Sequence, residues 1–276
     1  MSRRKVEIVV LSDIHLGTYG CRAEEIITYL KSIQPGMLIL NGDIIDIWQF
    51  SKRYWPKSHM AVIKEVIRLT SKGVPVYYLT GNHDELLRKF SDFSLGTFHL
   101  RDKLILDLPE GKAWIFHGDI FDASMKHAKW LAKLGAVGYD FLIFLNSIVN
   151  WTLARLGRGK MSFSKKIKNG VKSAIKYISD FEEIAAELAI DQGYEYVICG
   201  HIHQPQIREI VKPEGKVTYL NSGDWIENLT ALEYHHNKWS LFRFEDMTPG
   251  EKLLTAIDDA FFETKQHPQQ KELIIS

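Results

Sequence analysis

The sequence predicts an α/β protein in which two mixed β-sheets pack together in four layers, with helices outside and a helical segment inserted. Three observations predict it. The N-terminal part alternates apolar strand-like runs with helix-spaced segments, and the last part of the core reads as short antiparallel strands. Between them lies a long stretch with helical periodicity and no proline.

The N-terminal part reads as β-α-β-α-β. Its strands are predicted at Val6–Leu11, Met37–Leu40 and Val76–Leu79. Arg22–Ile33 has apolar residues at helical spacing before a Pro-Gly pair, and a second helix is expected from about Ser58 to Ser71. This order favours a sheet covered by helices.

Later strands are shorter and separated by turns. Short strands are expected from Thr97 to Phe116, and His235–Lys238 reads as a hairpin turn. The region from about 248 to 276 is expected to be an appendage outside the core. The remaining strands are predicted at Trp114–Phe116, Tyr196–Cys199, Val217–Leu220, Leu229–Tyr234 and Trp239–Phe244.

The inserted segment, residues 121–192, is expected to form a helical cap on a core made of 1–120 and 193–247. Its apolar part, Phe141–Leu156, is interrupted by polar residues and is shorter than the roughly 20 residues that a bilayer-spanning helix needs. No acidic residue lies between Asp140 and Asp180, while lysine and arginine are frequent there. The pattern therefore indicates a cap with one apolar and one basic face.

The composition is that of a soluble globular protein. The 276 residues are 45% hydrophobic and 25% charged, with a net charge of +1 that favours no strongly acidic or basic partner. Cys21 and Cys199 are too few for a disulfide framework and fit a reducing compartment. The first apolar run is too short for a signal peptide. We therefore expect a cytoplasmic protein without a spanning segment.

Five of the strands end in loops that carry Asp, Asn or His. The polar ends are expected to converge on one edge of the fold, where carboxylate, carboxamide and imidazole groups together are typical of a metal site. The loop sequences are Ser12-Asp13-Ile14-His15, Asn41-Gly42-Asp43, Thr80-Gly81-Asn82-His83-Asp84, His117-Gly118-Asp119 and Gly200-His201-Ile202-His203.

In this order, the loops resemble the calcineurin-like metallophosphoesterase superfamily over residues 6 to about 225. The resemblance implies two divalent ions, with manganese preferred and iron or zinc as alternatives. It assigns two sets of metal ligands that share one carboxylate. These sets are Asp13, His15, Asp43 and His203 for one ion, and Asp43, Asn82, His117 and His201 for the other.

The chemistry agrees with that partition. A shared carboxylate holds two ions roughly 3.5–4 Å apart, close enough to share an attacking hydroxide. His83 is expected to protonate the leaving oxygen or stabilise phosphate charge, with Asp84 orienting it. Asp119 and Asp122 are expected to support the ligands or to contact substrate hydroxyls, the alternative being solvated turn carboxylates.

Within the superfamily, the chain resembles the UDP-2,3-diacylglucosamine hydrolase group of lipid A biosynthesis. By this resemblance, Ser162, Lys165 and Lys168 contact phosphate and sugar, the alternative being a solvated basic helix face. One position departs from the group, since His83 stands where its members carry arginine. The motifs that carry the resemblance are Ser-Asp-Ile-His-Leu-Gly at 12–17, Asn-Gly-Asp-Ile-Ile-Asp-Ile-Trp at 41–48, His-Gly-Asp at 117–119 and Gly-His-Ile-His-Gln-Pro at 200–205.

Three functions compete at this stage. The first is hydrolysis of a phosphate ester or pyrophosphate in an amphipathic lipid, with peripheral binding to the inner membrane surface. The second is hydrolysis of soluble nucleotides or other phosphodiesters. The nearly all-apolar Phe141–Leu156 disfavours nucleic acid, whose sites interleave basic residues with aromatics. The third is a non-catalytic scaffold, which would have no need of the full ligand set.

Overall fold

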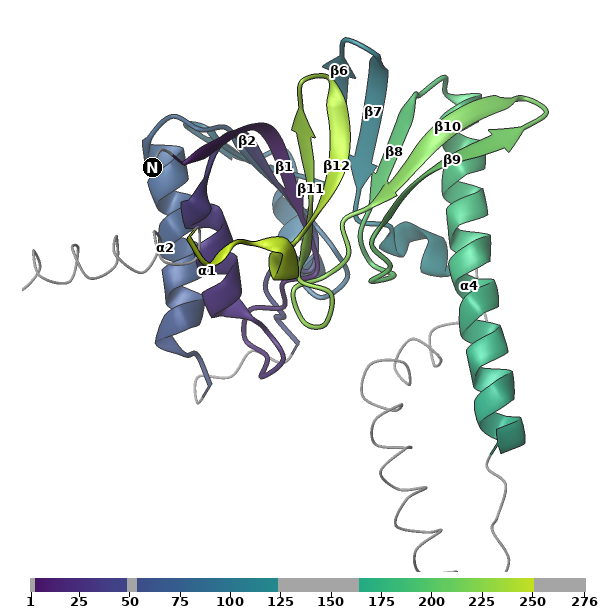
Figure 1. Ribbon diagram of the computed structural model, residues 1–276, viewed down its shortest axis with the longest axis horizontal. Helices are drawn as coiled ribbons and strands as arrows, with labels where there is room; N and C mark the ends of the chain where they lie inside the picture. The colour runs from purple at the N-terminus through teal and green to yellow at the C-terminus, as the bar shows by residue number, and fades with distance from the viewer. Residues whose placement is uncertain (1–2, 49–53, 124–163, 251–276) are drawn as a thin grey trace, which may run out of the picture.

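The computed structural model describes residues 3–48, 54–123 and 164–250, with only the backbone for 164–173. The described residues form two mixed sheets, as the sequence predicts (Figure 1). The first runs in the order β12 (Lys238–Arg243), β11 (Thr230–His235), β1 (Arg4–Leu11), β2 (Ile33–Asn41), β3 (Val76–Leu79), β5 (Phe98–Arg101) and β4 (Ser94–Leu95). The second runs β6 (Lys103–Leu108), β7 (Gly111–Phe116), β8 (Tyr196–Cys199), β10 (Gly215–Asn221) and β9 (Gln206–Lys212).

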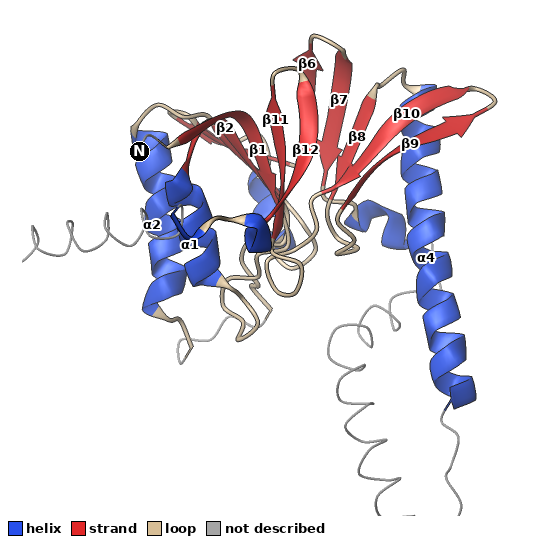
Figure 2. Ribbon diagram, in the orientation of Figure 1, coloured by secondary structure: helices blue, strands red, loops and turns tan. Residues whose placement is uncertain are grey.

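Three apolar layers hold the sandwich together, and Figure 2 shows helices on its two outer sides. Alternate residues of each strand face opposite sides, so one strand feeds two layers. In β1, Val9 and Leu11 pack toward helices α1 (Ala23–Ser32) and α2 (Lys57–Ser71), while Ile8 and Val10 pack toward the second sheet. The second sheet packs its other face on helix α4 (Ser164–Asp191). The four-layer prediction is therefore confirmed.

The parallel strands deliver their loops to one edge of the sandwich. Strands β1, β2 and β3 are parallel neighbours, and β7, β8 and β10 are parallel in the second sheet. Backbone hydrogen bonds then join loops that follow different strands: Asp13 N donates to Gly42 O at 3.1 Å, and Gly200 N donates to His117 O at 3.0 Å. The loop residues singled out in the sequence are therefore neighbours in space.

Strand β2 begins earlier than the sequence indicates. It starts at Ile33, directly after α1, and takes Pro35 and Gly36 into the strand. The sequence pattern predicts that this pair separates the helix from the strand, whereas it lies inside the strand. Gly36 also serves the sheet, because a Cβ there would lie 2.8 Å from the carbonyl oxygen of Glu7 on β1.

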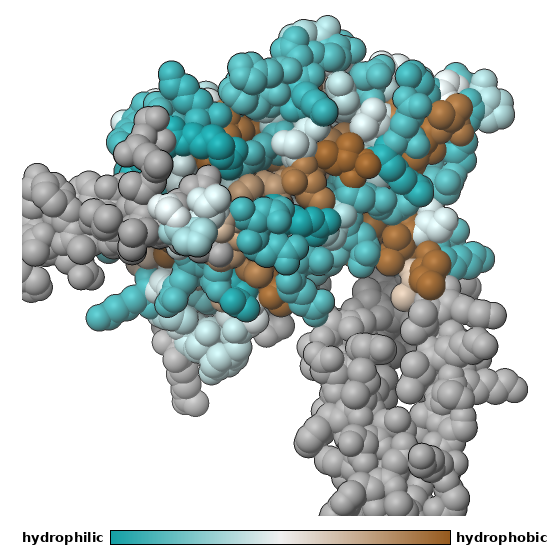
Figure 3. All heavy atoms as spheres, in the orientation of Figure 1, coloured by the Kyte–Doolittle hydropathy of each residue, from teal (hydrophilic) through white to brown (hydrophobic). Residues whose placement is uncertain are grey.

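No helix within the described part of the chain is long and apolar enough to cross a membrane. The face in Figure 3 is mostly hydrophilic, with apolar side chains gathered in small patches. The apolar run Phe141–Leu156, on which the predicted apolar face of the cap depends, lies outside the described residues.

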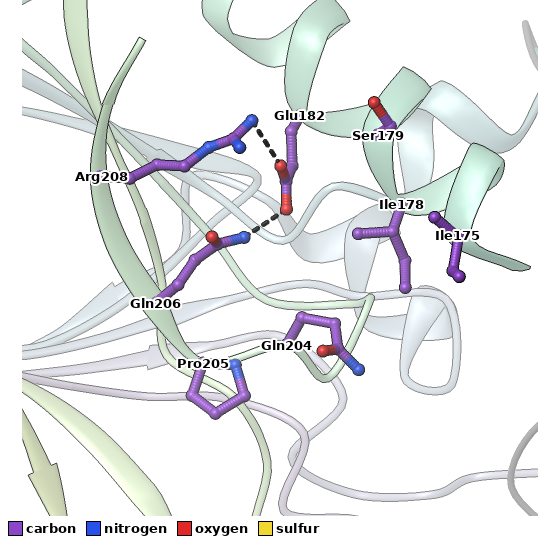
Figure 4. Close-up of a pocket in the computed structure, with 8 residues that line it drawn as sticks. All are labelled: Ile175, Ile178, Ser179, Glu182, Gln204, Pro205, Gln206 and Arg208. Atoms are coloured by element: carbon purple, nitrogen blue, oxygen red, sulfur yellow. Dashed lines mark hydrogen bonds and ion pairs between the residues drawn. The ribbon is translucent and has the colours of Figure 1, made fainter.

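The C-terminal part of the expected cap belongs to the core. Phe181, Ala185 and Ala189 of α4 are buried against the second sheet. Nearby, Glu182 accepts a hydrogen bond from Gln206 and forms an ion pair with Arg208, both on β9, as Figure 4 shows. Helical periodicity alone does not distinguish a helix that covers an active site from one that covers a sheet, so the division of the chain at residue 192 stays a prediction.

Candidate metal centre

The first group of candidate ligands is Asp13, His15 and His203. Asp13 and His15 follow β1, and His203 follows β8; one ligand atom from each lies within 4.8 Å of the others. Asp13 is fully buried, and its Oδ1 lies 3.1 Å from His203 Nε2. Two strand ends, one from each sheet, thus supply a carboxylate and two imidazoles to one point.

The second group is Asp43, His117 and His201, from the loops after β2, β7 and β8. His117 Nε2 lies 3.2 Å from Asp43 Oδ2. Asp43 also groups with His15 and His83, and His15 belongs to the first group. Asp43 therefore stands between the two sets, as the shared carboxylate of the sequence-based assignment should.

The backbone at these positions is unusual. Five of the seven candidate ligands are non-glycine residues with positive φ, a conformation sparsely populated by L-residues. Such strain is typical of functional sites, where the surrounding structure enforces it. The five are Asp13 at 52°, His15 at 54°, Asp43 at 54°, His201 at 67° and His203 at 52°.

Two motif glycines are required by close approach. A Cβ on Gly81 would lie 2.3 Å from Asp43 Oδ1, and a Cβ on Gly200 would lie 2.6 Å from Asp13 Oδ2. Any larger residue would push a carboxylate out of its place. The glycines in these loops are thus part of the ligand geometry, since they leave room for the two aspartates.

Several candidate ligands present buried polar atoms that have no hydrogen-bond partner among the described residues. They are Asp13 Oδ1, His15 Nε2, Asn82 Oδ1 and His117 Nε2. Buried polar atoms are rarely left unpaired. In His117, Nδ1 lies 2.9 Å from Asn41 O and donates to it, so Nε2, which lies beside Asp43, is the nitrogen available to an ion. This donor set of carboxylate, carboxamide and imidazole fits divalent ions that accept both nitrogen and oxygen ligands.

The charges agree with that fit. Burial opposes ionisation of Asp13, but His203 and His117 outweigh it and lower its pKa to about 2. Burial alone would lower the pKa of His203, yet Asp13, Asp224 and Asp43 raise it to about 9. The pKa of His117 is likewise raised despite burial, chiefly by Asp43 and Asp13. Divalent ions would compete with these imidazole protons, so their affinity should rise with pH.

His83 is oriented by Asp46, and the prediction that Asp84 orients it is wrong. His83 Nδ1 lies 2.9 Å from Asp46 Oδ2, and the same oxygen lies 3.6 Å from His15 Nδ1. Asp84 turns away and holds the loop: it accepts from the backbone amides of Gly81 and Ile44 and from the Tyr78 hydroxyl. Asp46 is buried and stands three residues after Asp43. The Asp-x-x-Asp spacing is the sequence feature that could have indicated its place in the site.

Asp122 supports a ligand. Its Oδ1 lies 2.9 Å from His201 Nε2 and accepts from the Tyr177 hydroxyl at 2.7 Å. Asp119 instead pairs with Arg88 at 3.0 Å. Tyr177 was missed, because nothing near it in the sequence marks it as part of the site.

A further buried carboxylate, that of Asp224, lies 3.8 Å from His203 Nδ1 and was also missed. Of the predicted substrate contacts in the insertion, Ser162 lies outside the described residues. Lys165 and Lys168 lie in the part of α4 whose side chains are not described.

The sequence of the chain matches a family model. The model for the calcineurin-like phosphoesterases matches residues 6–205, which is well over half of the chain and includes every candidate ligand. The chain belongs to the calcineurin-like phosphoesterase family. It is a hydrolase of phosphate esters, and its family implies the divalent metal chemistry that the two ligand groups fit.

Similar proteins carry a more specific name. A UDP-2,3-diacylglucosamine hydrolase from Aliivibrio fischeri strain MJ11 is 26% identical over 243 residues, covering 86% of this chain and 98% of that protein. One from Stenotrophomonas maltophilia strain K279a is 25% identical, covering 84% and 96%. Among solved structures, an archaeal phosphodiesterase is 16% identical with a TM-score of 0.41, covering 86% of this chain and 98% of that one.

Gly81→Ala should reduce the amount of metal that the centre holds. Its Cβ would displace Asp43 Oδ1, so metal content after dialysis, measured by elemental analysis, should fall well below that of the unaltered protein. Gly73→Ala is the matched control: Gly73 has a φ of +83° but open space around its Cβ position. It should cost about 1 kcal/mol of folding free energy and leave the metal content unchanged. Full metal content in Gly81→Ala would contradict this geometry.

Proposed function

We propose that this chain is a dinuclear metal-dependent phosphoesterase. One ion would be held by Asp13, His15, Asp43 and His203, and the other by Asp43, Asn82, His117 and His201, with manganese preferred. The observation that carries the proposal is the position of Asp43, which groups with His15 on one side and with His117 and His201 on the other. When bound, the ions supply Lewis-acid activation of water and neutralise charge on the phosphate.

The residues of the chain do the remaining work by fixing geometry. The backbone amide of His83 donates to Asp43 Oδ1 at 2.8 Å and holds the shared carboxylate. His201 N donates to Asp13 Oδ2 at 3.1 Å and holds the other. The carbonyl oxygen of Asn41 lies 2.9 Å from His117 Nδ1, and Asp122 Oδ1 lies 2.9 Å from His201 Nε2, so each ring is held by a contact of its own. Such supporting contacts preserve ligand orientation before substrate arrives.

We assign His83 the role of general acid, positioned by Asp46. Its side chain is 24% exposed, so a substrate can reach it, and it packs against His15 and Trp48. Burial opposes protonation of the ring, but the hydrogen bond that the ring donates to Asp46 and the charge of Asp43 raise its pKa. A protonated imidazole can give its proton to the leaving oxygen.

For the substrate, we propose a UDP-diacylglucosamine-like lipid, cleaved at its pyrophosphate. This proposal is supported by the relatives named UDP-2,3-diacylglucosamine hydrolase, which align with this chain over nearly their whole length. The basic residues of the insertion, including Lys165 and Lys168, would contact its phosphate and sugar, and Ser162 would contribute beside them. Such a substrate would bring the protein to the cytoplasmic face of the inner membrane as a peripheral protein.

A soluble nucleotide or another phosphodiester is the second candidate. The observation that favours it is His83, which stands where the lipid hydrolases carry arginine. An arginine can clamp a phosphate but cannot give up a proton near neutral pH, whereas histidine can. A site with histidine at this position can therefore protonate a poor leaving group, which arginine at the same position cannot do.

A substrate panel distinguishes the two candidates. Purified protein with added manganese would be offered UDP-2,3-diacylglucosamine, bis-p-nitrophenyl phosphate and a dinucleotide. The proposal expects the highest kcat/KM on the lipid, and loss of every activity in excess chelator with recovery on adding manganese. Preference for the dinucleotide would replace the lipid by a soluble substrate, and full activity in excess chelator would contradict the metal chemistry itself.

His83→Ala should impair turnover and spare metal binding. Loss of a general acid typically lowers the rate by about 10²–10⁴-fold. The loss of kcat should be large for a poor leaving group and small for p-nitrophenolate, which leaves without protonation. Asp46→Asn should cause a smaller loss with the same dependence. Equal losses of kcat on both kinds of leaving group would show instead that His83 only positions the phosphate.

A further inference from the structure

A second cluster of metal-ligating side chains lies away from the catalytic loops. Strands β1 and β11 are antiparallel, and Ile8 pairs with Tyr234; the next pair along the same register is Glu7 and His235. The other end of β11 is at the catalytic edge, where the Thr230 hydroxyl donates to Ser222 O. His235 therefore lies at the far end of the strand from the phosphoesterase centre.

Three side chains converge there. One ligand atom from each of Glu7, His235 and His236 lies within 4.8 Å of the others. His235 Nδ1 is 3.2 Å from Glu7 Oε1. Although this nitrogen is shielded from water, it makes no hydrogen bond to any described residue. The backbone amide of His236 donates to the same Glu7 oxygen at 3.0 Å, which holds the carboxylate beside both rings.

The backbone makes this convergence possible. Neighbouring residues of an extended strand point to opposite faces, so two consecutive histidines would normally diverge. Here His236 enters the hairpin turn with a φ of 49°, followed by Asn237 at 59°. The two imidazoles are consequently only 3.9 Å apart between ring centroids. Asparagine and glycine suit these turn positions better than histidine does, so turn geometry alone does not call for a histidine at 236.

We propose that Glu7, His235 and His236 form a separate binding site for a divalent transition ion of the zinc class. Two imidazoles and one carboxylate are a zinc ligand set, and they leave a fourth position for water. Imidazole ligands favour zinc, copper or nickel over magnesium or calcium. The Glu7 side chain is 49% exposed and that of His235 is 40% exposed, so an ion can enter from solvent. The bound ion would tie β1 to the β11–β12 hairpin.

The test compares zinc binding in the whole protein with a variant that should keep its fold. His236→Asn removes one imidazole and places in the turn a residue that suits a positive φ. His99→Gln is the matched control, since His99 lies on β5, contacts Ser94 Oγ and is not part of the cluster. All chains would be dialysed against the same buffered free zinc concentration, and the bound zinc counted by elemental analysis.

We expect His236→Asn, alone or with Glu7→Gln, to hold one zinc fewer per chain than the unaltered protein and His99→Gln. Because the result is a difference, it does not depend on how many ions the catalytic centre takes. Zinc should also raise the melting temperature less in His236→Asn than in the control. Equal zinc counts in all chains, or an equal loss in His99→Gln, would overturn the proposed site.

Discussion

The carboxylate of Asp43 is the group on which the arrangement of the centre depends. One oxygen accepts the His83 amide and fills the space that the absent side chain of Gly81 leaves, while the other lies beside His117. Asp43 lies in the loop after β2, the middle strand of the first sheet, and His117 lies directly after β7 of the second. The contact between them closes the gap between two sheets at their loop edge, so the fold and the centre constrain each other.

Because the fold and the centre constrain each other, residues with strained backbone conformations lie close together in the loops of the centre. Parallel strands end together, but their loops would ordinarily spread outward over the surface. Left-handed conformations at Asp13, Asp43 and His201 turn the side chains back toward one another. The strain persists because buried strands and loop-to-loop hydrogen bonds leave no relaxed alternative. A bound ion would then offset the repulsion between Asp13 and Asp43, which the neighbouring histidines already reduce.

Much of the fold, and the convergence of six of the seven predicted ligands, could be predicted from the sequence because both follow from local patterns, while their binding of metal stays a prediction. Apolar runs marked the strands, and the residues that ended them were the ones that converged. Two other features could not be predicted, because they depend on tertiary contacts. Asp46 rather than Asp84 meets His83, because the direction of a side chain after a turn is set by tertiary contacts and not by adjacency. Likewise, α4 could be predicted as a helix, but the burial of Phe181 depends on a sheet formed by residues distant in sequence.

The most direct measurement of the central claim is anomalous diffraction from crystals of the manganese-loaded protein, collected on both sides of the manganese edge. The account predicts two peaks roughly 3.5–4 Å apart, with the Asp43 carboxylate between them and His15 and His203 beside one, His117 and His201 beside the other. A single peak, or two peaks without Asp43 between them, would contradict it.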